Sequence, residues 1–240
     1  MKRKYYDKWL GIIVLCVAFC VCTDVVCAQS DIDDTDQHLD SLVAMLNSNL
    51  TPDERLELLD QIGYAHYNVD STAKYAQLEL NLAKELKNSE KIGNAYKLLG
   101  WCSYIHDDYS RSCEFYREAI NCFDSAGMHD KLASAYYGLA SALSVMGDDM
   151  LADDYYNRAL NIFIEVRDTA CVAEIWRKKG IASTNFHLYM TADDYFHRAL
   201  NLDSLRNDSA AIGEDIYMLG VNEFSNIFSY NADLHCIKAY

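Results

Sequence analysis

The sequence predicts an all-α protein, an α-solenoid of stacked antiparallel helical hairpins, and three observations carry this prediction. Similar residues return every forty positions over most of the 240-residue chain. Within each unit, apolar residues recur at spacings of three and four, which is the period of an amphipathic helix. One proline and ten glycines supply too few turn residues for a many-stranded β sandwich or barrel.

The repeat is clearest in segments 152–162 and 192–202, which are identical at eight of eleven positions. Small residues mark the same period elsewhere in the chain. They are Gly100, Ala140, Gly180 and Gly220 in the first half of each unit, and Ala119, Ala159, Ala199 and Ala239 in the second half. Such self-similarity is typical of arrays in which neighbouring units share one core.

Each unit is predicted to be one helical hairpin. Short turns are indicated at Asp107-Asp108, at Gly147-Asp148 and in the stretch 187–189, with Asp suited to cap the following helix. A small residue on each helix lets the two backbones approach closely. We therefore expect Gly180 and Ala159 to lie where helices cross.

The units resemble tetratricopeptide repeats, whose pattern is W-x2-L-G-x2-Y followed by A-x3-F. The first half is matched at 96–100, 136–140, 176–180 and 216–220, and the second at 112–119, 152–159 and 192–199, with a weaker copy at 232–239. The resemblance covers residues 51–240. It implies a right-handed superhelix of about five hairpins, the last of them at the chain end.

Three features depart from the family pattern. The period is forty rather than thirty-four, the terminal Pro is absent, and the Tyr after the Gly is replaced by Ser103, Leu143, Ser183 and Glu223. The longer period predicts a longer second helix and a longer connector in each unit.

Residues 1–28 have the order of a secretory signal peptide: positive charges, then an apolar run over 9–22, then small residues before Gln29. An uncleaved membrane anchor and a lipid-modified Cys27 are the alternatives. The apolar run is short for a membrane span, which needs about 20 residues. The sequence thus predicts an exported protein, periplasmic or secreted.

Residues 29–50 precede the array. They comprise an acidic tether, with five acidic or hydroxyl side chains and one Ile at 31–36, and a short leading helix at 40–46 that we expect to cover the first repeat. The chain has a net charge of −15, and residues 29–240 hold 17 basic against 34 acidic residues. This acidity argues against nucleic acid and anionic lipid as partners, since both depend on clustered Lys and Arg.

The sequence contains no recognisable catalytic, metal-ligand or phosphate-binding motif. We therefore expect a non-enzymatic protein without cofactor or metal. Five cysteines follow residue 28, and they are best explained as small buried hydrophobes: Cys102, Cys113, Cys122, Cys171 and Cys236. A bridge between two of the first three is left open, because an exported chain can form disulfides.

The resemblance implies that the first helix of each hairpin lines a concave groove. The residues of these helices that flank the small Gly or Ala site are the candidate contacts for a protein or peptide. They are Tyr64, Tyr67, Lys97, Trp101, Tyr104, Tyr137, Arg177, Thr184, Tyr217 and Phe224. Aromatic residues and Arg are the usual interface hot spots, and the two cations suit the carboxylates of a peptide.

Two functions stay open. The first is an exported scaffold that binds a protein or peptide in its groove without catalysis. The second is the periplasmic sensory region of a larger signal-transduction protein, a kinase or DNA-binding regulator, whose later part follows Tyr240. The last repeat has an apolar edge and no unit to cap it, so we also expect self-association there.

The signal-peptide assignment makes one testable prediction. After expression in a bacterial host that exports it, the mature protein should begin near Gln29, as N-terminal sequencing of the exported fraction will show. Recovery of Met1 on a membrane-bound form would mean that the segment is an uncleaved anchor.

Overall fold

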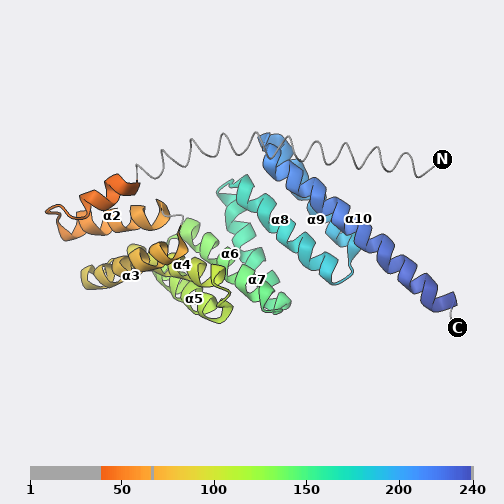
Figure 1. The fold of residues 1–240 in the computed structure, drawn as a ribbon, viewed down its shortest axis with the longest axis horizontal. Helices are drawn as coiled ribbons and strands as arrows, with labels where there is room; N and C mark the ends of the chain where they lie inside the picture. The colour runs from red at the N-terminus through yellow and green to blue at the C-terminus, as the bar shows by residue number, and fades with distance from the viewer. Residues whose placement is uncertain (1–38, 66–67, 239–240) are drawn as a thin grey trace.

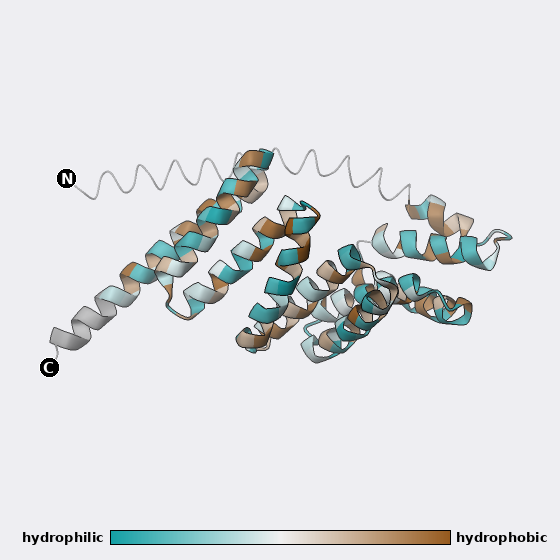
Figure 2. Ribbon diagram, turned by 180° about the vertical axis from the view of Figure 1, so that it is seen from behind, coloured by the Kyte–Doolittle hydropathy of each residue, from teal (hydrophilic) through white to brown (hydrophobic). Residues whose placement is uncertain are grey.

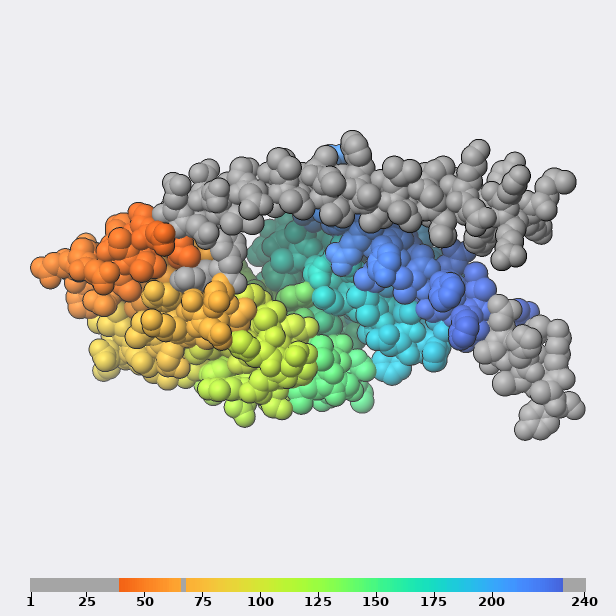
Figure 3. Space-filling view, viewed as in Figure 1, coloured from red at the N-terminus to blue at the C-terminus, as the bar shows by residue number. Residues whose placement is uncertain are grey.

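The computed structural model describes residues 39–65 and 68–238, with side chains to residue 230. Within these residues the protein is all-helical, and its helices form antiparallel hairpins that follow one another along the molecule (Figure 1). The helices are α2 (Pro52–Ala65), α3 (Val69–Leu86), α4 (Ser89–Ile105), α5 (Tyr109–Ala126), α6 (His129–Val145), α7 (Asp149–Glu165), α8 (Thr169–Asn185), α9 (Tyr189–Arg206) and α10 (Ser209–Lys238). The predicted solenoid of hairpins is confirmed, and its units succeed one another across the surface in chain order (Figure 3).

The helices account for most of the forty-residue period. In the hairpins from α4 to α9 both helices have 17 or 18 residues. The connectors have only two or three residues, so the prediction of a longer connector is wrong, and the extra length lies in both helices of each hairpin. Asp108 caps α5 by accepting a hydrogen bond from the backbone N–H of Arg111 at 3.1 Å, as expected, whereas Asp148 makes no side-chain cap.

The turns repeat as regularly as the helices. In the hairpins formed by α4 to α9 the chain reverses at a residue with positive φ, which is Asp107, Gly147 or His187. The next position of this series is Ile227. A β-branched residue is strongly disfavoured in the left-handed region, and no turn forms there. The predicted fifth hairpin is therefore wrong, because α10 continues as one helix of 30 residues.

The core follows from the helix crossings. A Cβ added to Gly180 would lie 2.6 Å from the ring of Phe196, and one added to Gly100 would lie 3.1 Å from the ring of Tyr116. Ala159 is fully buried. Gly180 and Ala159 thus lie in tightly packed positions, as predicted, and each helix alternates hydrophobic with hydrophilic segments (Figure 2).

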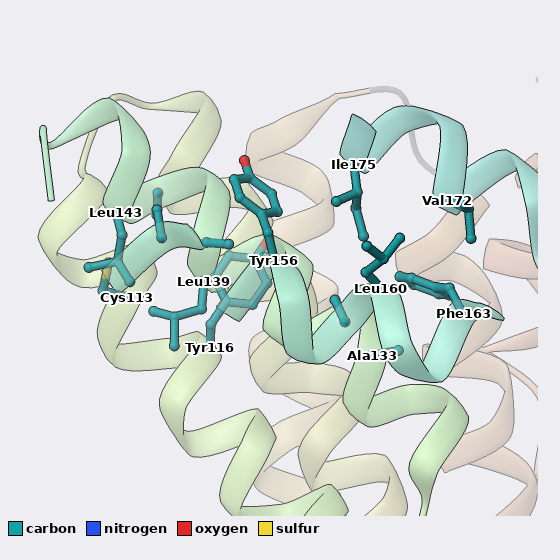
Figure 4. Packing of buried hydrophobic residues seen from close by; sticks show 14 residues of the cluster. Cys113, Tyr116, Ala133, Leu139, Leu143, Tyr156, Leu160, Phe163, Val172 and Ile175 are labelled. Atoms are coloured by element: carbon teal, nitrogen blue, oxygen red, sulfur yellow. The ribbon is translucent and has the colours of Figure 1, made fainter. Parts of the chain in front are cut away.

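Neighbouring hairpins share this core. In Figure 4, Leu160 and Phe163 of α7 point toward Ile175 and Val172 of α8, within one cluster of buried side chains. At the other end of the array, a short helix at 39–45 buries Leu39 and Leu42 against α2, as expected for a leading helix. The acidic tether at 31–36 lies outside the described residues.

A buried carboxyl group lies between the first helices. Glu79 of α3 is fully buried, and neither of its oxygens makes a hydrogen bond within the described part of the chain. Burial, followed by the negative charge of Asp60, raises the pKa of Glu79 to about 9. Asp60 in turn accepts hydrogen bonds from Lys91 at 2.7 Å and from Asn94 at 3.1 Å. Glu79 is therefore protonated in the folded protein at neutral pH.

The helix crossings predict opposite effects for two glycines. Gly180→Ala should lower the free energy of unfolding by about 1–3 kcal/mol, because the buried ring of Phe196 has no room to move. Gly213→Ala on α10, where an added Cβ meets nothing within 4 Å, should raise it by up to about 1 kcal/mol through helix propensity. Urea unfolding followed by circular dichroism measures both. Equal effects of the two changes would contradict the proposed crossings.

The buried Glu79 predicts a pH dependence of stability. The folded state keeps the proton up to about pH 9, whereas the unfolded chain releases it above its ordinary pKa of 4.5. The free energy of unfolding should therefore fall as pH rises between these values, with the full contribution present below the lower one. Urea unfolding at about pH 5 and about pH 8.5 should show a smaller difference for Glu79→Gln than for the wild type. Glu85→Gln, on an exposed side chain of the same helix, is the control and should keep the wild-type difference.

Candidate functional site

The first helices of the hairpins enclose a cavity of about 470 Å³. It is lined mainly by α2, α4 and α6, with Tyr116 contributed by α5 and Lys178 by α8. Five of the ten predicted groove residues line it together: Tyr64, Lys97, Trp101, Tyr104 and Tyr137. The structure therefore brings half of the predicted groove residues together, in the N-terminal half of the array.

Aromatic rings make most of the wall. Tyr104 lies edge-on against Tyr109 with ring centroids 5.4 Å apart, and Tyr137 lies 6.0 Å from Tyr156. Trp101 is 39% exposed, so part of its side chain is open to a ligand. Such half-exposed rings offer large apolar contact area at low cost in side-chain entropy.

Polar groups stand at defined points of this wall. The hydroxyl of Tyr137 donates a hydrogen bond to Glu174 at 3.2 Å, and the hydroxyls of Ser141 and Tyr156 lie 3.2 Å apart. Burial raises the pKa of Tyr137, with the charge of Glu174 next in importance. The phenol therefore stays protonated. Ser134 adds a further hydroxyl to the lining.

Lys97 is the charged centre of the cavity. Its Nζ lies 5.3 Å from the ring centroid of Tyr64. Burial, and then the positive charge of Lys131, lower the pKa of Lys97. A cation in such a place gains from any anion that reaches it.

The other sheltered cations are already neutralised. Six Lys and Arg side chains in the described chain are buried or half-buried, and all except Lys97 form an ion pair with a carboxylate. The paired ones are Lys91, Lys131, Arg177, Lys178 and Lys179. Lys178, which lines the same cavity, is held by Glu174 at 3.2 Å. Within the described residues, Lys97 is thus the sheltered cation without an acidic partner.

Arg177 was predicted to face the groove, and this prediction is wrong. The residue is 4% exposed, and its guanidinium binds Asp203 of α9 and Asp215 of α10, both at 2.8 Å. Glu174 on its own helix completes the pairing. Burial raises the pKa of Asp215, and Arg177 opposes this shift. Arg177 therefore joins α8, α9 and α10 and is not available to a ligand.

The other predicted residues within the described ranges do not line the cavity. Thr184 is half-buried and donates a hydrogen bond to Asn222 at 2.9 Å, which ties α8 to α10. Tyr217 and Phe224 are exposed on α10. Tyr67 lies outside the described residues. Ile105, Ser134 and Lys178 line the cavity but were not predicted. These three residues also lie on the first helices of their hairpins, so including more positions around the small Gly or Ala site would have identified them.

The described residues contain no group of three or more His, Cys, Asp or Glu placed to hold a metal ion. Cys102, Cys113, Cys122 and Cys171 are free thiols, so the bridge left open among the first three is not formed in the structure. Burial raises the pKa of Cys102 to about 11, which disfavours the reactive thiolate. Within the described ranges, no helix has the length and apolar character needed to span a bilayer.

Several solved structures share this fold. BtubC (BKLC) from P. vanneervenii has 16% identity and a TM-score of 0.66, covering 88% of this chain and 89% of that chain. Aspartyl phosphate phosphatase F from Bacillus subtilis has 13% identity and a TM-score of 0.67, covering 87% of this chain and 55% of that chain, so this chain spans about half of the phosphatase. A Rap protein in complex with competence and sporulation factor has 12% identity and a TM-score of 0.65, covering 88% and 72%. At these identities the likeness shows the fold alone.

No curated protein sequence matches the chain. The family profile described as "SusR N-terminal TPR domain" matches residues 30–196, which is well over half of the chain. The resemblance of the repeats to tetratricopeptide repeats is therefore confirmed. The chain is a protein-interaction domain of this class. The chain belongs to the SusR N-terminal TPR domain family.

Proposed function

We propose that the array binds an extended segment of a peptide or protein in the cavity between α2, α4 and α6, and that a carboxylate of this segment pairs with Lys97. The role is that of a binding domain and is non-catalytic. The observation that carries the proposal is the position of Lys97, sheltered among aromatic rings and without a carboxylate partner in the described chain.

The lining supports a peptide as the ligand. Trp101, Tyr104 and Tyr137 provide aromatic surface for apolar side chains, and aromatic residues are the commonest anchors of protein interfaces. Hydroxyl groups of Ser134 and Ser141 offer hydrogen bonds to a backbone. The similar Rap structure is a complex with competence and sporulation factor, which is consistent with a binding role for this fold.

We also propose that the domain acts outside the cytoplasm, as the sensory region of a larger signal-transduction protein. Two observations support this: the signal-peptide pattern of residues 1–28, and a family described as an N-terminal domain. A free exported scaffold is the alternative, and the coding sequence after Tyr240 distinguishes the two.

The binding proposal is tested with the fluorescence of Trp101. In a Trp176→Phe background, Trp101 is the one tryptophan left after cleavage near Gln29. The probes are two pools of heptapeptides with acetylated N-termini and amidated C-termini. Peptides of the acidic pool carry one central Asp or Glu between apolar residues. Peptides of the neutral pool carry Asn or Gln at that position. The acidic pool should bind more tightly. Lys97→Met should weaken its binding by about 30-fold, corresponding to a hot spot of about 2 kcal/mol.

Lys178→Met is the matched control, since Lys178 lines the same cavity but is already paired with Glu174. This change should alter the dissociation constant of the acidic pool by less than about threefold, as expected for a charge at the edge of an interface. Equal binding of both pools, or equal loss in both variants, would contradict the role of Lys97. Absence of any signal from either pool would contradict a peptide site at this cavity.

A further inference from the structure

The last helix has two unlike faces. One face is anchored to the array by buried polar groups. Asp215 pairs with Arg177 of α8, and Asn222 accepts a hydrogen bond from Thr184 at 2.9 Å and donates one to the backbone oxygen of Tyr189 at 2.9 Å. These contacts orient α10 and leave its opposite face toward solvent.

The opposite face is apolar. At about 100° per residue, a stripe centred on Phe224 spans about 140° of the helix circumference. Its large side chains are all exposed, from 38% for Val221 to 71% for Phe224: Ile216, Tyr217, Val221, Phe224, Ile227 and Phe228. The C-terminal part of the helix also extends beyond the ends of α8 and α9 (Figures 1 and 2). A stripe of this width is typical of a helix that packs against another helix.

Gly220 lies on this stripe at the crossing position of the repeat. Its counterparts forty residues apart are covered, Gly180 by the ring of Phe196 and Gly100 by the ring of Tyr116. An added Cβ on Gly220 would meet nothing within 4 Å. Elsewhere in the array this notch receives an aromatic ring from an antiparallel helix. On α10 no ring of the described residues fills it.

We propose that the ring comes from α10 of a second copy of the chain, which pairs antiparallel about a two-fold axis at Phe224. Gly220, Phe224 and Phe228 are four residues apart and lie on one ridge of the helix. Antiparallel pairing centred on Phe224 places Phe228 of each protomer over Gly220 of the partner subunit. This repeats the contact between Phe196 and Gly180 inside the chain. Both notches are then filled, and the assembly closes as a dimer.

Charge and area are consistent with this partner. From Ile216 to Tyr230 the helix carries one charged residue, Glu223, so the strongly acidic chain brings little repulsion into the seam. Burying the exposed parts of the stripe removes roughly 600 Å² per protomer, on the basis of about 150–250 Å² for each aromatic side chain. The total of about 1,200 Å² reaches the lower limit for a specific interface.

The first test measures mass against concentration by sedimentation equilibrium of the exported chain after cleavage near Gln29. The wild type should be a dimer that dissociates on dilution. Gly220→Leu fills the notch at a position where an added Cβ meets no atom of the described protomer within 4 Å. It should therefore raise the dimer dissociation constant about tenfold or more while the helical circular dichroism is unchanged. Phe228→Ala should have the same effect, since it removes the ring that enters the notch.

The second test locates the axis by disulfide trapping. Under mild oxidation Phe224→Cys should form a covalent dimer, because the axis brings this position next to its own copy. Tyr230→Cys, at an equally exposed position off the stripe, should form no more covalent dimer than the wild type with its native cysteines.

A monomer at all concentrations would overturn the proposal, as would a dimer that Gly220→Leu and Phe228→Ala leave intact. A dimer that Phe224→Cys fails to trap would exclude the antiparallel pairing. Specific binding of a different helical protein to the monomer through this stripe would likewise replace the second copy as its occupant.

Discussion

The array depends on one kind of helix contact. Two antiparallel helices approach each other at a glycine or alanine of the first helix, and a large side chain of the second helix packs over it. Phe196 over Gly180 and Tyr116 over Gly100 are examples. Because neither helix can bury its apolar stripe alone, this contact makes the hairpin the unit of stability, and stacking of hairpins completes the core. The fixed spacing of the small residues sets the forty-residue period.

The same constraint forms the candidate site. When every hairpin crosses at the same position, its first helix always lies on the same side of the array, and α2, α4 and α6 come together around one cavity. Most sheltered cations nearby have been neutralised by carboxylates of neighbouring helices. Lys97 has not, and burial among aromatic rings lowers its pKa. The site thus combines apolar contact area with one charge that a ligand can complete.

The two ends of the described array differ in whether the apolar face of the terminal helix is covered. At the N-terminal end, the helix at 39–45 covers the first hairpin with Leu39 and Leu42. At the C-terminal end, α10 is held by the pairing of Arg177 with Asp203 and Asp215, and its apolar stripe is left open. The polar anchor and the apolar stripe lie on opposite sides of one helix, so attachment to the array and contact with a second copy do not compete.

The sequence by itself determined the helical class, the period, the crossing residues and five of the cavity residues, because spacing along a helix dictates which side chains share a face. The structure decided what depends on partners distant in the chain. Arg177 has the phase of a groove residue, but its charge is taken by Asp203 and Asp215, 26 and 38 residues further on. The fifth hairpin failed for a local reason that pattern matching overlooked, since Ile227 occupies the turn position where Asp107, Gly147 and His187 adopt positive φ. The free state of Lys97 is likewise a tertiary property, because only the packed array shows which carboxylates reach which cations.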